Sequence, residues 1–171
     1  PCLDDFYQTV IDLDVPLFIH PAGNDGIRSY RDSRLTRFGL DLIVGYAYEE
    51  TLAVAALILG GVFDRHPRLD LCVSHGGGAI AFLAERFNSM ASFLNTESDF
   101  VSALRSLWYD SHLELGAAQD FVTSIVGQDR MVYGTNFGGW DSPNETSSFD
   151  ESLGTNAERL LRLLPKEEEV L

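Results

Sequence analysis

The sequence predicts an α/β fold in which parallel strands alternate with helices, and two observations support this prediction. Short apolar runs rich in strand-forming residues alternate four times with longer helical stretches along the 171 residues. Each apolar run ends in polar residues, as expected where a buried parallel strand reaches the edge of its sheet. A complete (β/α)8 barrel has eight such units in about 250 residues, and with four units the chain supplies about half of one. The alternative is a small open parallel sheet with flanking helices.

The segment at residues 68–78 shows this pattern most clearly. Residues 71–73 (Leu-Cys-Val) form an apolar run without alternation, as in a parallel strand that is covered on both faces. His75 follows, then three glycines that let the backbone turn sharply, and then a helical stretch at 79–94. We therefore expect His75 at the carboxyl end of a strand, which is where α/β folds bind their ligands. A core histidine beside a structural glycine turn is the alternative.

The other helices and strands follow from periodicity, capping residues and proline positions. Helices are expected at residues 3–13, 49–64, 99–106, 119–126 and 157–164. The other strands are expected at residues 15–21, 107–112 and 130–136. Asn156 is expected to cap the last helix, with a helical turn at 150–153 and a long loop at 22–45.

The composition indicates an acidic globular protein. Hydrophobic residues make up 45% of the chain, and the formal net charge of -14 argues against nucleic acid or an anionic membrane as a partner. Cys2 and Cys72 lie far apart and are expected to be free thiols in a reducing compartment. The acidic start does not resemble a signal peptide, and the longest apolar run, 52–59, is too short to span a bilayer. We expect a single domain over residues 1–171 in the cytoplasm.

Polar residues follow each predicted strand, and three of the four histidines are among them. These strand-end residues are His20, His75, Asp110 or His112, and Asn136. Parallel strands bring such ends to one rim, where imidazoles and oxygen ligands suit a divalent metal such as zinc. Buried, hydrogen-bonded polar residues are the alternative, and His112 could equally face solvent. His66, in a His-Pro turn that closes a helix, is expected to be structural.

A set of motifs in fixed order adds a resemblance to a known family. The motifs are Leu17-Phe18-Ile19-His20-Pro21, Glu50-Thr51 with Gly60-Gly61-Val62-Phe63, His66-Pro67-Arg68-Leu69, Ser74-His75-Gly76-Gly77-Gly78 with Arg86, Tyr133-Gly134-Thr135-Asn136-Phe137, and Asn156-Ala157. With these motifs the chain resembles the carboxyl-terminal half of the amidohydrolase-2 family. That family includes metal-dependent hydrolases and decarboxylases of the aminocarboxymuconate-semialdehyde decarboxylase type. The resemblance covers nearly the whole chain.

The resemblance implies a distorted (β/α)8 TIM barrel with one divalent metal, often zinc. It makes His20 a metal ligand and His75 the acid/base or polarising residue beside the metal, acting on bound water or substrate. It also implies that Arg86 reaches across a dimer interface to a substrate carboxylate, which suits the guanidinium fork. From the residues alone, Arg86 would instead form a surface salt bridge with an acid such as Glu85. Four arginines in the predicted loop form either a solvated segment or a lid that faces the substrate: Arg28, Arg31, Arg34 and Arg37.

The chain departs from the family pattern in two places. The paired ligands that the family carries on its first strand have no counterpart here. The family also has a metal-binding Asp where this chain has Asn136, and an amide oxygen without charge is a weaker ligand. Asp141 lies close in sequence and could substitute. We therefore expect this chain alone to bind zinc weakly or not at all, through His20 and Asn136.

The function predicted from these features is that of a metal-dependent decarboxylase or hydrolase, with the carbon–carbon lyase favoured. Its substrate would be small and carboxylate-bearing, aromatic compounds included. The alternative is a truncated or degenerate, non-catalytic homologue that serves as a binding or partner subunit. Half a barrel leaves sheet edges and apolar faces uncovered, so we expect a homo-oligomer, and by resemblance a dimer.

Overall fold

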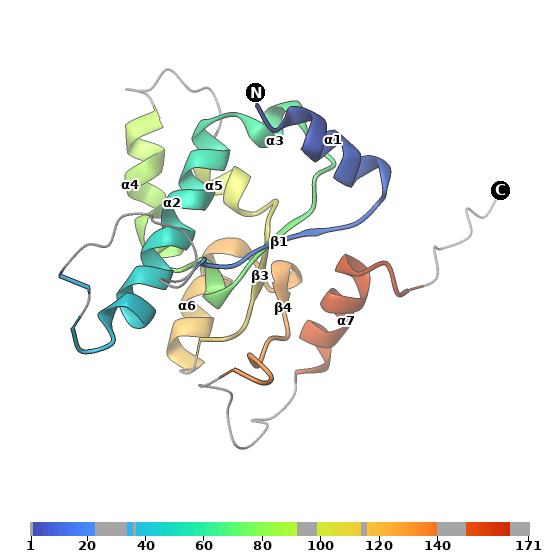
Figure 1. Cartoon of the computed structure of the whole chain (residues 1–171). Helices are drawn as coiled ribbons and strands as arrows, with labels where there is room; N and C mark the ends of the chain where they lie inside the picture. Colours follow the sequence, from blue (N-terminus) through green and yellow to red (C-terminus); the bar gives the residue numbers. More distant parts are fainter. Residues whose placement is uncertain are drawn as a thin grey trace.

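Four short parallel strands form a single sheet in the order β1-β2-β3-β4, with helices on both of its faces (Figure 1). The computed structural model describes residues 2–22, 34–35, 37–91, 99–113, 116–139 and 150–164. The strands are β1 (Leu17–Ile19), β2 (Leu71–Val73), β3 (Trp108–Asp110) and β4 (Met131–Val132). The predicted parallel α/β fold and all four strand positions are confirmed. The single domain over residues 1–171 stays a prediction.

Seven α-helices and three other short helical segments lie in the described parts of the chain. They are α1 (Asp4–Asp12), η1 (Asp41–Gly45), α2 (Tyr46–Leu59), α3 (Val62–Arg65), η2 (His75–Gly77), α4 (Ile80–Ala91), α5 (Phe100–Leu104), α6 (Gly116–Val126), η3 (Gln128–Arg130) and α7 (Glu151–Leu160). Asp99 caps α5 by accepting from the Val101 N–H, and Asp150 caps α7 by accepting from the Ser152 N–H. Each crossover between neighbouring strands contains at least one helix, as parallel pairing requires.

The sheet has one fully covered face and one partly covered face. Side chains of alternate strand positions, among them Val73, Tyr109 and Met131, pack against α2, α4, α5 and α6. The opposite face carries Cys72, Trp108 and Val132, on which Leu160 of α7 packs. Phe18 pairs in register with Cys72 yet is 60% exposed. The second face is therefore covered at β4 and open at β1, as expected for part of a larger barrel.

The segment before the predicted second helix differs from the expectation. Residues 41–45 were expected at the end of a loop, but η1 continues directly into α2. The helix ends at Leu59, five residues earlier than expected, because Gly61 adopts a left-handed backbone (φ +66°) and α3 starts afresh after it.

The end of the chain also differs from the expectation. The predicted turn at 150–153 and the last helix form one helix, α7, which ends at Leu160. Asn156 is not its cap. It is buried within α7 and donates to the backbone oxygens of Gln128 and Met131, both at 2.8 Å. These bonds, with one from the Tyr133 N–H to the Leu153 carbonyl, cover the outer edge of β4.

One helical segment of the described chain, Asp41–Leu59, is both long and apolar. It is 19 residues long and contains an 18-residue window with a mean hydropathy of 1.6, so by length and composition the segment could cross a membrane. The sequence prediction considered only the uninterrupted run at 52–59. The core helix of a globular protein has the same composition, and here Val54 and Ile58 of α2 pack in the core.

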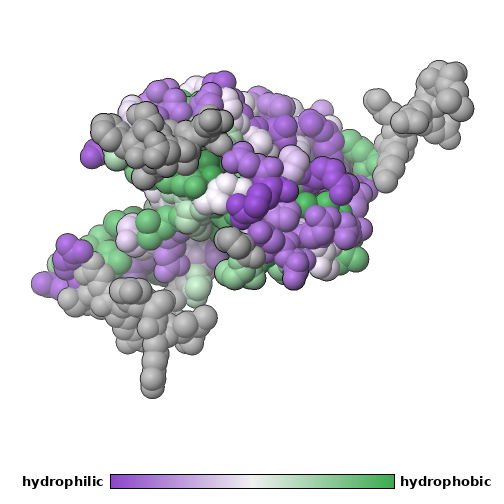
Figure 2. Space-filling view, turned by 90° about the horizontal axis from the view of Figure 1, so that it is seen from above, coloured by the Kyte–Doolittle hydropathy of each residue, from purple (hydrophilic) through white to green (hydrophobic). Residues whose placement is uncertain are grey.

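Apolar side chains also reach the surface of this helical segment. Exposed examples are Ile43, Val44, Tyr48 and Leu52. Figure 2 shows hydrophobic surface on its left side, where Figure 1 places α2 and α4. Phe82 of α4 is exposed as well.

Candidate active site

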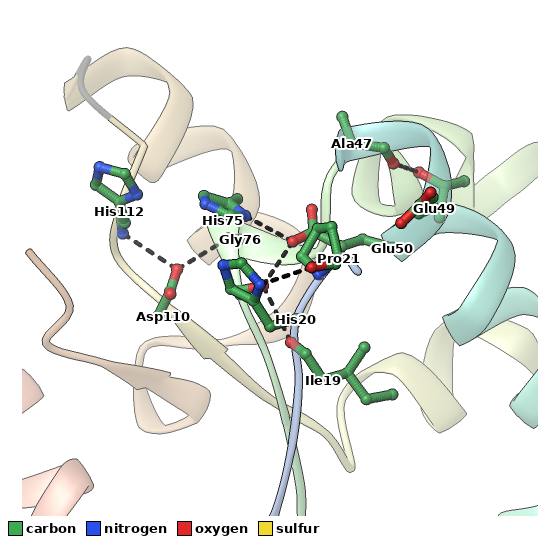
Figure 3. Close-up of polar contacts among 12 residues, drawn as sticks. Ile19, His20, Pro21, Ala47, Glu49, Glu50, His75, Gly76, Asp110 and His112 are labelled. Atoms are coloured by element: carbon green, nitrogen blue, oxygen red, sulfur yellow. Dashed lines mark hydrogen bonds and ion pairs between the residues drawn. The ribbon is translucent and has the colours of Figure 1, made fainter. Parts of the chain in front are cut away.

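Three imidazole rings lie side by side beyond the carboxyl ends of the strands (Figure 3). His20 follows β1, His75 follows β2, and His112 follows β3. The ring centroid of His75 lies 5.5 Å from that of His20 and 5.3 Å from that of His112, and the Tyr46 ring is 5.9 Å from both His20 and His75. The structure thus brings His20 and His75 to the same rim, as the sequence led us to expect, and places His112 beside them. Their chemical roles stay predictions.

Glu50 holds the central ring from the side of α2. Its Oε1 lies 2.6 Å from His75 Nδ1 and accepts from the Ser74 hydroxyl, also at 2.6 Å. Glu50 is only 1% exposed, although it is a carboxylate. His75 itself has a left-handed backbone (φ +47°), which is uncommon for a residue other than glycine and is often retained at functional sites.

In the sequence, Glu50 is recognisable only as part of a motif, without a predicted role. A signal for its burial was present, because Glu50 lies four residues before Val54 and eight before Ile58. Residues at this spacing share one face of a helix. The face that buries Val54 and Ile58 therefore also turns Glu50 inward, toward the end of β2.

Gly78 allows α2 to approach the histidine turn closely. Its backbone (φ +65°, ψ −123°) is open to glycine and strained for other residues, and a Cβ at this position would collide with the backbone of Ala47. Thr51 links the same elements, since its hydroxyl donates to the Ala47 carbonyl and accepts from the Ala79 N–H. The glycine run thus fixes the distance between His75 and Glu50.

Asp110 supports the turn from the end of β3. Its Oδ1 accepts from the backbone N–H groups of Gly76 and His112, each at 3.2 Å. Burial raises the pKa of the Asp110 carboxyl above its ordinary value of 3.8, and these N–H groups and the neighbouring His75 partly oppose that rise. Asp110 therefore ties the ends of β2 and β3 together while it lies next to the imidazole rings.

His20 is oriented as metal-binding histidines usually are. Its Nδ1 lies 2.8 Å from the Pro21 carbonyl oxygen, so Nδ1 donates and Nε2 keeps its lone pair. The side chain is exposed at the rim, beside the Tyr46 ring. This geometry suits a ligand role for His20.

The other two predicted site residues come from the turn after β4 and from helix α4. Asn136 lies beyond the end of β4 with a left-handed backbone (φ +48°), which asparagine tolerates, and its side chain rests against Gly139 of its own turn. Arg86 lies about one and a half turns into α4 with an exposed side chain, at the surface.

Part of the arginine cluster and Asp141 lie outside the described residues. Arg28, Arg31 and Asp141 belong to segments that the structure does not describe. Arg37 is described, and its guanidinium lies 4.9 Å from the ring centroid of Phe38. His66 is buried, and its Nε2 lies 3.2 Å from Asp4 Oδ1, a structural contact far from the rim.

The residues described provide part of a metal site. Among them, no group of three or more His, Cys, Asp or Glu side chains is arranged to hold a metal ion. Protein zinc sites generally use three or four protein ligands. His20 offers one imidazole, and Asn136 at most a neutral oxygen. The described chain does not fit a complete metal centre, so we derive no chemical step through a metal.

The sequence of residues 3–163 matches the amidohydrolase profile Amidohydro_2, and the chain belongs to this family. It is 28% identical over 149 residues to 2-amino-3-carboxymuconate-6-semialdehyde decarboxylase of Dictyostelium discoideum, covering 80% of this chain and 38% of that protein. It is 25% identical over 180 residues to gamma-resorcylate decarboxylase of a Rhizobium species, covering 92% of this chain and 54% of that protein. The chain thus spans between about a third and about half of the length of these relatives.

Solved structures of similar fold agree with this assignment. One is 5-carboxyvanillate decarboxylase of Novosphingobium aromaticivorans in complex with manganese and 4-hydroxy-3-methoxy-5-nitrobenzoic acid. Its TM-score is 0.75 at 23% identity, covering 94% of this chain and 53% of that chain. The four-stranded sheet is therefore part of a TIM barrel of the amidohydrolase type, as predicted.

Proposed function

We propose that this chain carries part of the active site of a metal-dependent decarboxylase that acts on small, carboxylate-bearing substrates, aromatic acids included. The observation that carries the proposal is the close pair of His20 and His75, 5.5 Å apart at the carboxyl ends of adjacent parallel strands. This is where TIM barrels carry out their chemistry. The named decarboxylases among its relatives support carbon–carbon cleavage over hydrolysis.

In this proposal His75 supplies the proton that replaces the carboxyl group. The bond between the substrate carbon and its carboxylate breaks, carbon dioxide leaves, and the electron pair stays on the substrate carbon. That carbon takes a proton from protonated His75, which becomes neutral, so charge and atoms balance. The short contact to Glu50 stabilises the protonated form of His75 before the transfer.

We also propose that His20 and Asn136 contribute to a divalent metal site that residues outside the described set complete. Zinc is the metal proposed from the imidazole ligand, and manganese, present in a structural neighbour, is its competitor. Calorimetric titration of the purified chain with each metal tests this proposal. We expect weak binding that Asn136→Asp strengthens and His20→Ala removes. Tight binding to the unmodified chain, unaffected by His20→Ala, would exclude these ligands.

The exposed position of Arg86 on α4 supports a role at a subunit interface. We propose that the protein forms a dimer in which Arg86 meets the substrate carboxylate of the other subunit. Arg86→Lys retains the charge and removes the fork, so it should raise KM more than it lowers kcat, without altering the oligomer measured by light scattering. A monomer at micromolar concentration would refute this arrangement.

The activity itself is tested with 2,6-dihydroxybenzoate as the probe substrate. The chain, expressed with any coding sequence that precedes Pro1 in its gene, is supplied with manganese or zinc, and release of carbon dioxide is measured. We expect release that His75→Gln abolishes and that His66→Gln, a change at the structural histidine, leaves in place. Release that survives His75→Gln would remove His75 from the reaction. Absence of release across a panel of hydroxybenzoates and carboxylated dienes would refute the decarboxylase proposal.

The non-catalytic alternative rests on Asn136 and on the incomplete ligand set. The comparisons provide no support for it, since the relatives named above are enzymes. A cytoplasmic location is proposed from the free thiols, an exposed Cys2 and a buried Cys72. Cell fractionation tests that location.

A further inference from the structure

Glu50 is a buried carboxylate without a role predicted from the sequence, and its contacts imply more than the stabilisation of protonated His75. Its side chain is fully enclosed, and its Oε2 has no hydrogen-bond partner among the described residues. Burial of a carboxylate is costly unless its partners are arranged to receive it. An apolar side chain of similar size would avoid that cost in the same position. The contacts of Oε1 must therefore explain why a carboxylate lies here.

Glu50 Oε1 contacts both the Ser74 hydroxyl and His75 Nδ1. The protons that these two groups carry determine whether Oε1 accepts or donates a hydrogen bond. The Ser74 hydroxyl has a single proton and lies 2.6 Å from Oε1 and 3.0 Å from the Ile19 carbonyl oxygen. That carbonyl already accepts from the Ser74 backbone N–H at 3.1 Å. The hydroxyl proton is therefore directed to Glu50 at the shorter distance, and Oε1 is an acceptor.

An acceptor at Oε1 determines which nitrogen of His75 carries the proton. The contact between Oε1 and Nδ1 is 2.6 Å long, which requires a proton on Nδ1. A neutral imidazole has one N–H, so its Nε2 then holds the lone pair. We propose that Glu50 is a positioning residue that holds His75 in the Nδ1–H tautomer and keeps Nε2 as the proton-accepting atom within the ring cluster.

The chemical consequence of this inference rests on the proposed function. A proton taken up at Nε2 converts His75 to an imidazolium, and the Glu50 carboxylate on the opposite nitrogen offsets the new charge. The ring stays in place during this change, because Ser74 and Gly78 fix the carboxylate and the turn on either side. Glu50 thus acts through His75 and has no contact with substrate in this proposal.

The tautomer can be read without substrate or metal. Long-range ¹H–¹⁵N spectra of the purified chain report which ring nitrogen of each histidine is protonated, at a pH where the rings are neutral. The chain has four histidines, and His75→Gln assigns the signals of His75. We expect a protonated Nδ1 and an unprotonated Nε2 in the wild-type chain. A proton on Nε2 instead would overturn the proposal, whatever the variants do.

Variants at Glu50 separate the acceptor from the charge. Glu50→Leu removes the acceptor, so the ring should revert to the Nε2–H form that imidazole prefers in water, seen as an exchange of the two nitrogen shifts. Glu50→Gln keeps an acceptor oxygen and should retain the tautomer. Glu49→Leu is the matched control on the same turn, because Glu49 accepts from the Ala22 N–H and not from His75. An unchanged tautomer in folded Glu50→Leu would refute the role of Glu50.

Kinetics of the active assembly then distinguish this inference from the proposed function. Glu50→Gln should lower kcat by roughly 10- to 100-fold with little change in KM, as loss of a supporting carboxylate typically does. Glu49→Gln should leave both constants unchanged. If the wild-type protein has no turnover, the decarboxylase proposal fails while the tautomer result stands. If folded Glu50→Leu, which has lost the acceptor oxygen, retains full kcat, the positioning role fails while the decarboxylase proposal stands.

Discussion

The polar groups at the two ends of the sheet differ in how they are paired. At the amino end, Arg162 pairs with Asp70 at 2.6 Å and with Asp14 at 2.9 Å, joining the segment after α7 to those before β2 and β1. The indole N–H of Trp108 donates to the other oxygen of Asp70. The guanidinium of Arg130 lies over the Trp108 ring, 5.1 Å from its centroid. Opposite charges and donors are matched at this end.

At the carboxyl end, the polar groups are arranged at a cost to stability. Glu50 is buried with one oxygen unsatisfied, and burial raises the pKa of Asp110. Imidazole rings crowd together there, and the exposed His20 faces the rim. Buried, perturbed groups of this kind are typical of functional sites in proteins.

This difference indicates where stability and function reside in the fold. Polar groups at the amino ends of barrel strands hold elements together, whereas those at the carboxyl ends carry function. Substitutions at the amino end should therefore lower the free energy of unfolding and leave the geometry of the imidazole rings unchanged. Substitutions at the carboxyl end should alter ring geometry, and only those that touch the backbone should strongly alter unfolding.

The largest effect is expected for Gly78→Ala. The new Cβ would collide with the Ala47 backbone and would impose a strained φ of +65°, so the free energy of unfolding should fall by on the order of 4 kcal/mol. Urea unfolding followed by circular dichroism measures this loss. Gly138→Ala is the matched control, with a φ of +82° and no atom within 4 Å of the added Cβ. If both variants lost the same free energy of unfolding, the close approach of α2 would not be the reason for glycine at position 78.

Asp110 should show a smaller effect that depends on the replacement. Asp110→Ala leaves the N–H groups of Gly76 and His112 without their acceptor, so the free energy of unfolding should fall by about 2 kcal/mol. Asp110→Asn retains an acceptor oxygen and should cost less than about 0.5 kcal/mol. Chemical denaturation of both variants tests the difference. If Asp110→Asn cost as much as Asp110→Ala, the charge itself would stabilise this end, and the contrast between the two ends would be wrong.

Arg162→Ala should weaken the amino end by about 1 kcal/mol, because its pairs with Asp14 and Asp70 are only partly shielded from solvent. The ring signals of His75 and His20 should not move in the NMR spectra, since the change lies at the other end of the strands. Arg68→Ala, at an exposed arginine close to β2, is the control and should change unfolding by less than about 0.5 kcal/mol. A shift of the His75 signals in Arg162→Ala would show that the two ends are coupled.

The sheet and its rim could be predicted because both follow from local pattern. Apolar runs without alternation define the strands, and the residue that follows each run must lie at one common edge. This logic located His20 and His75 correctly and left the orientation of His112 open. The orientation of a side chain two residues past a strand depends on the turn, and the turn after β3 is anchored by Asp110, a contact between distant residues.

The role of Glu50 was missed and that of Asn156 was misjudged, because tertiary contacts outweighed local preference. A glutamate in a helix is usually exposed, and only its spacing from Val54 indicated burial. Asparagine before a helical run is a good N-cap, but Asp150 is the N-cap of α7. The side-chain amide of Asn156 instead donates to the Met131 carbonyl at the edge of β4. In both cases the partner backbone or ring lies far away in sequence, where periodicity carries no information.

The smallest expected effect is the pH dependence that Asp110 gives to stability. Because burial raises its pKa above the ordinary value of 3.8, the folded chain binds this proton more tightly than the unfolded chain does. The contribution of Asp110 to stability is therefore greatest below pH 3.8 and declines as pH rises through the raised pKa of the folded state. Asp110→Asn lacks this proton, so the stability of the wild type minus that of Asp110→Asn should decline over the same range.

Other carboxyl groups make stability rise with pH, the opposite of the effect of Asp110. The pH dependence of stability must therefore be compared between the wild type and Asp110→Asn. Hydrogen bonds from Arg65 lower the pKa of Asp4, and hydrogen bonds from Ser152 lower that of Asp150, which makes each group stabilising above pH 3.8. Both groups are present in the wild type and in Asp110→Asn, and their contributions cancel in the difference. Urea unfolding of the two proteins side by side, from acid to neutral pH, measures that difference. A difference that rises with pH would mean that the ionised form of Asp110 is favoured in the folded chain, and the carboxyl end would then match its charges as the amino end does.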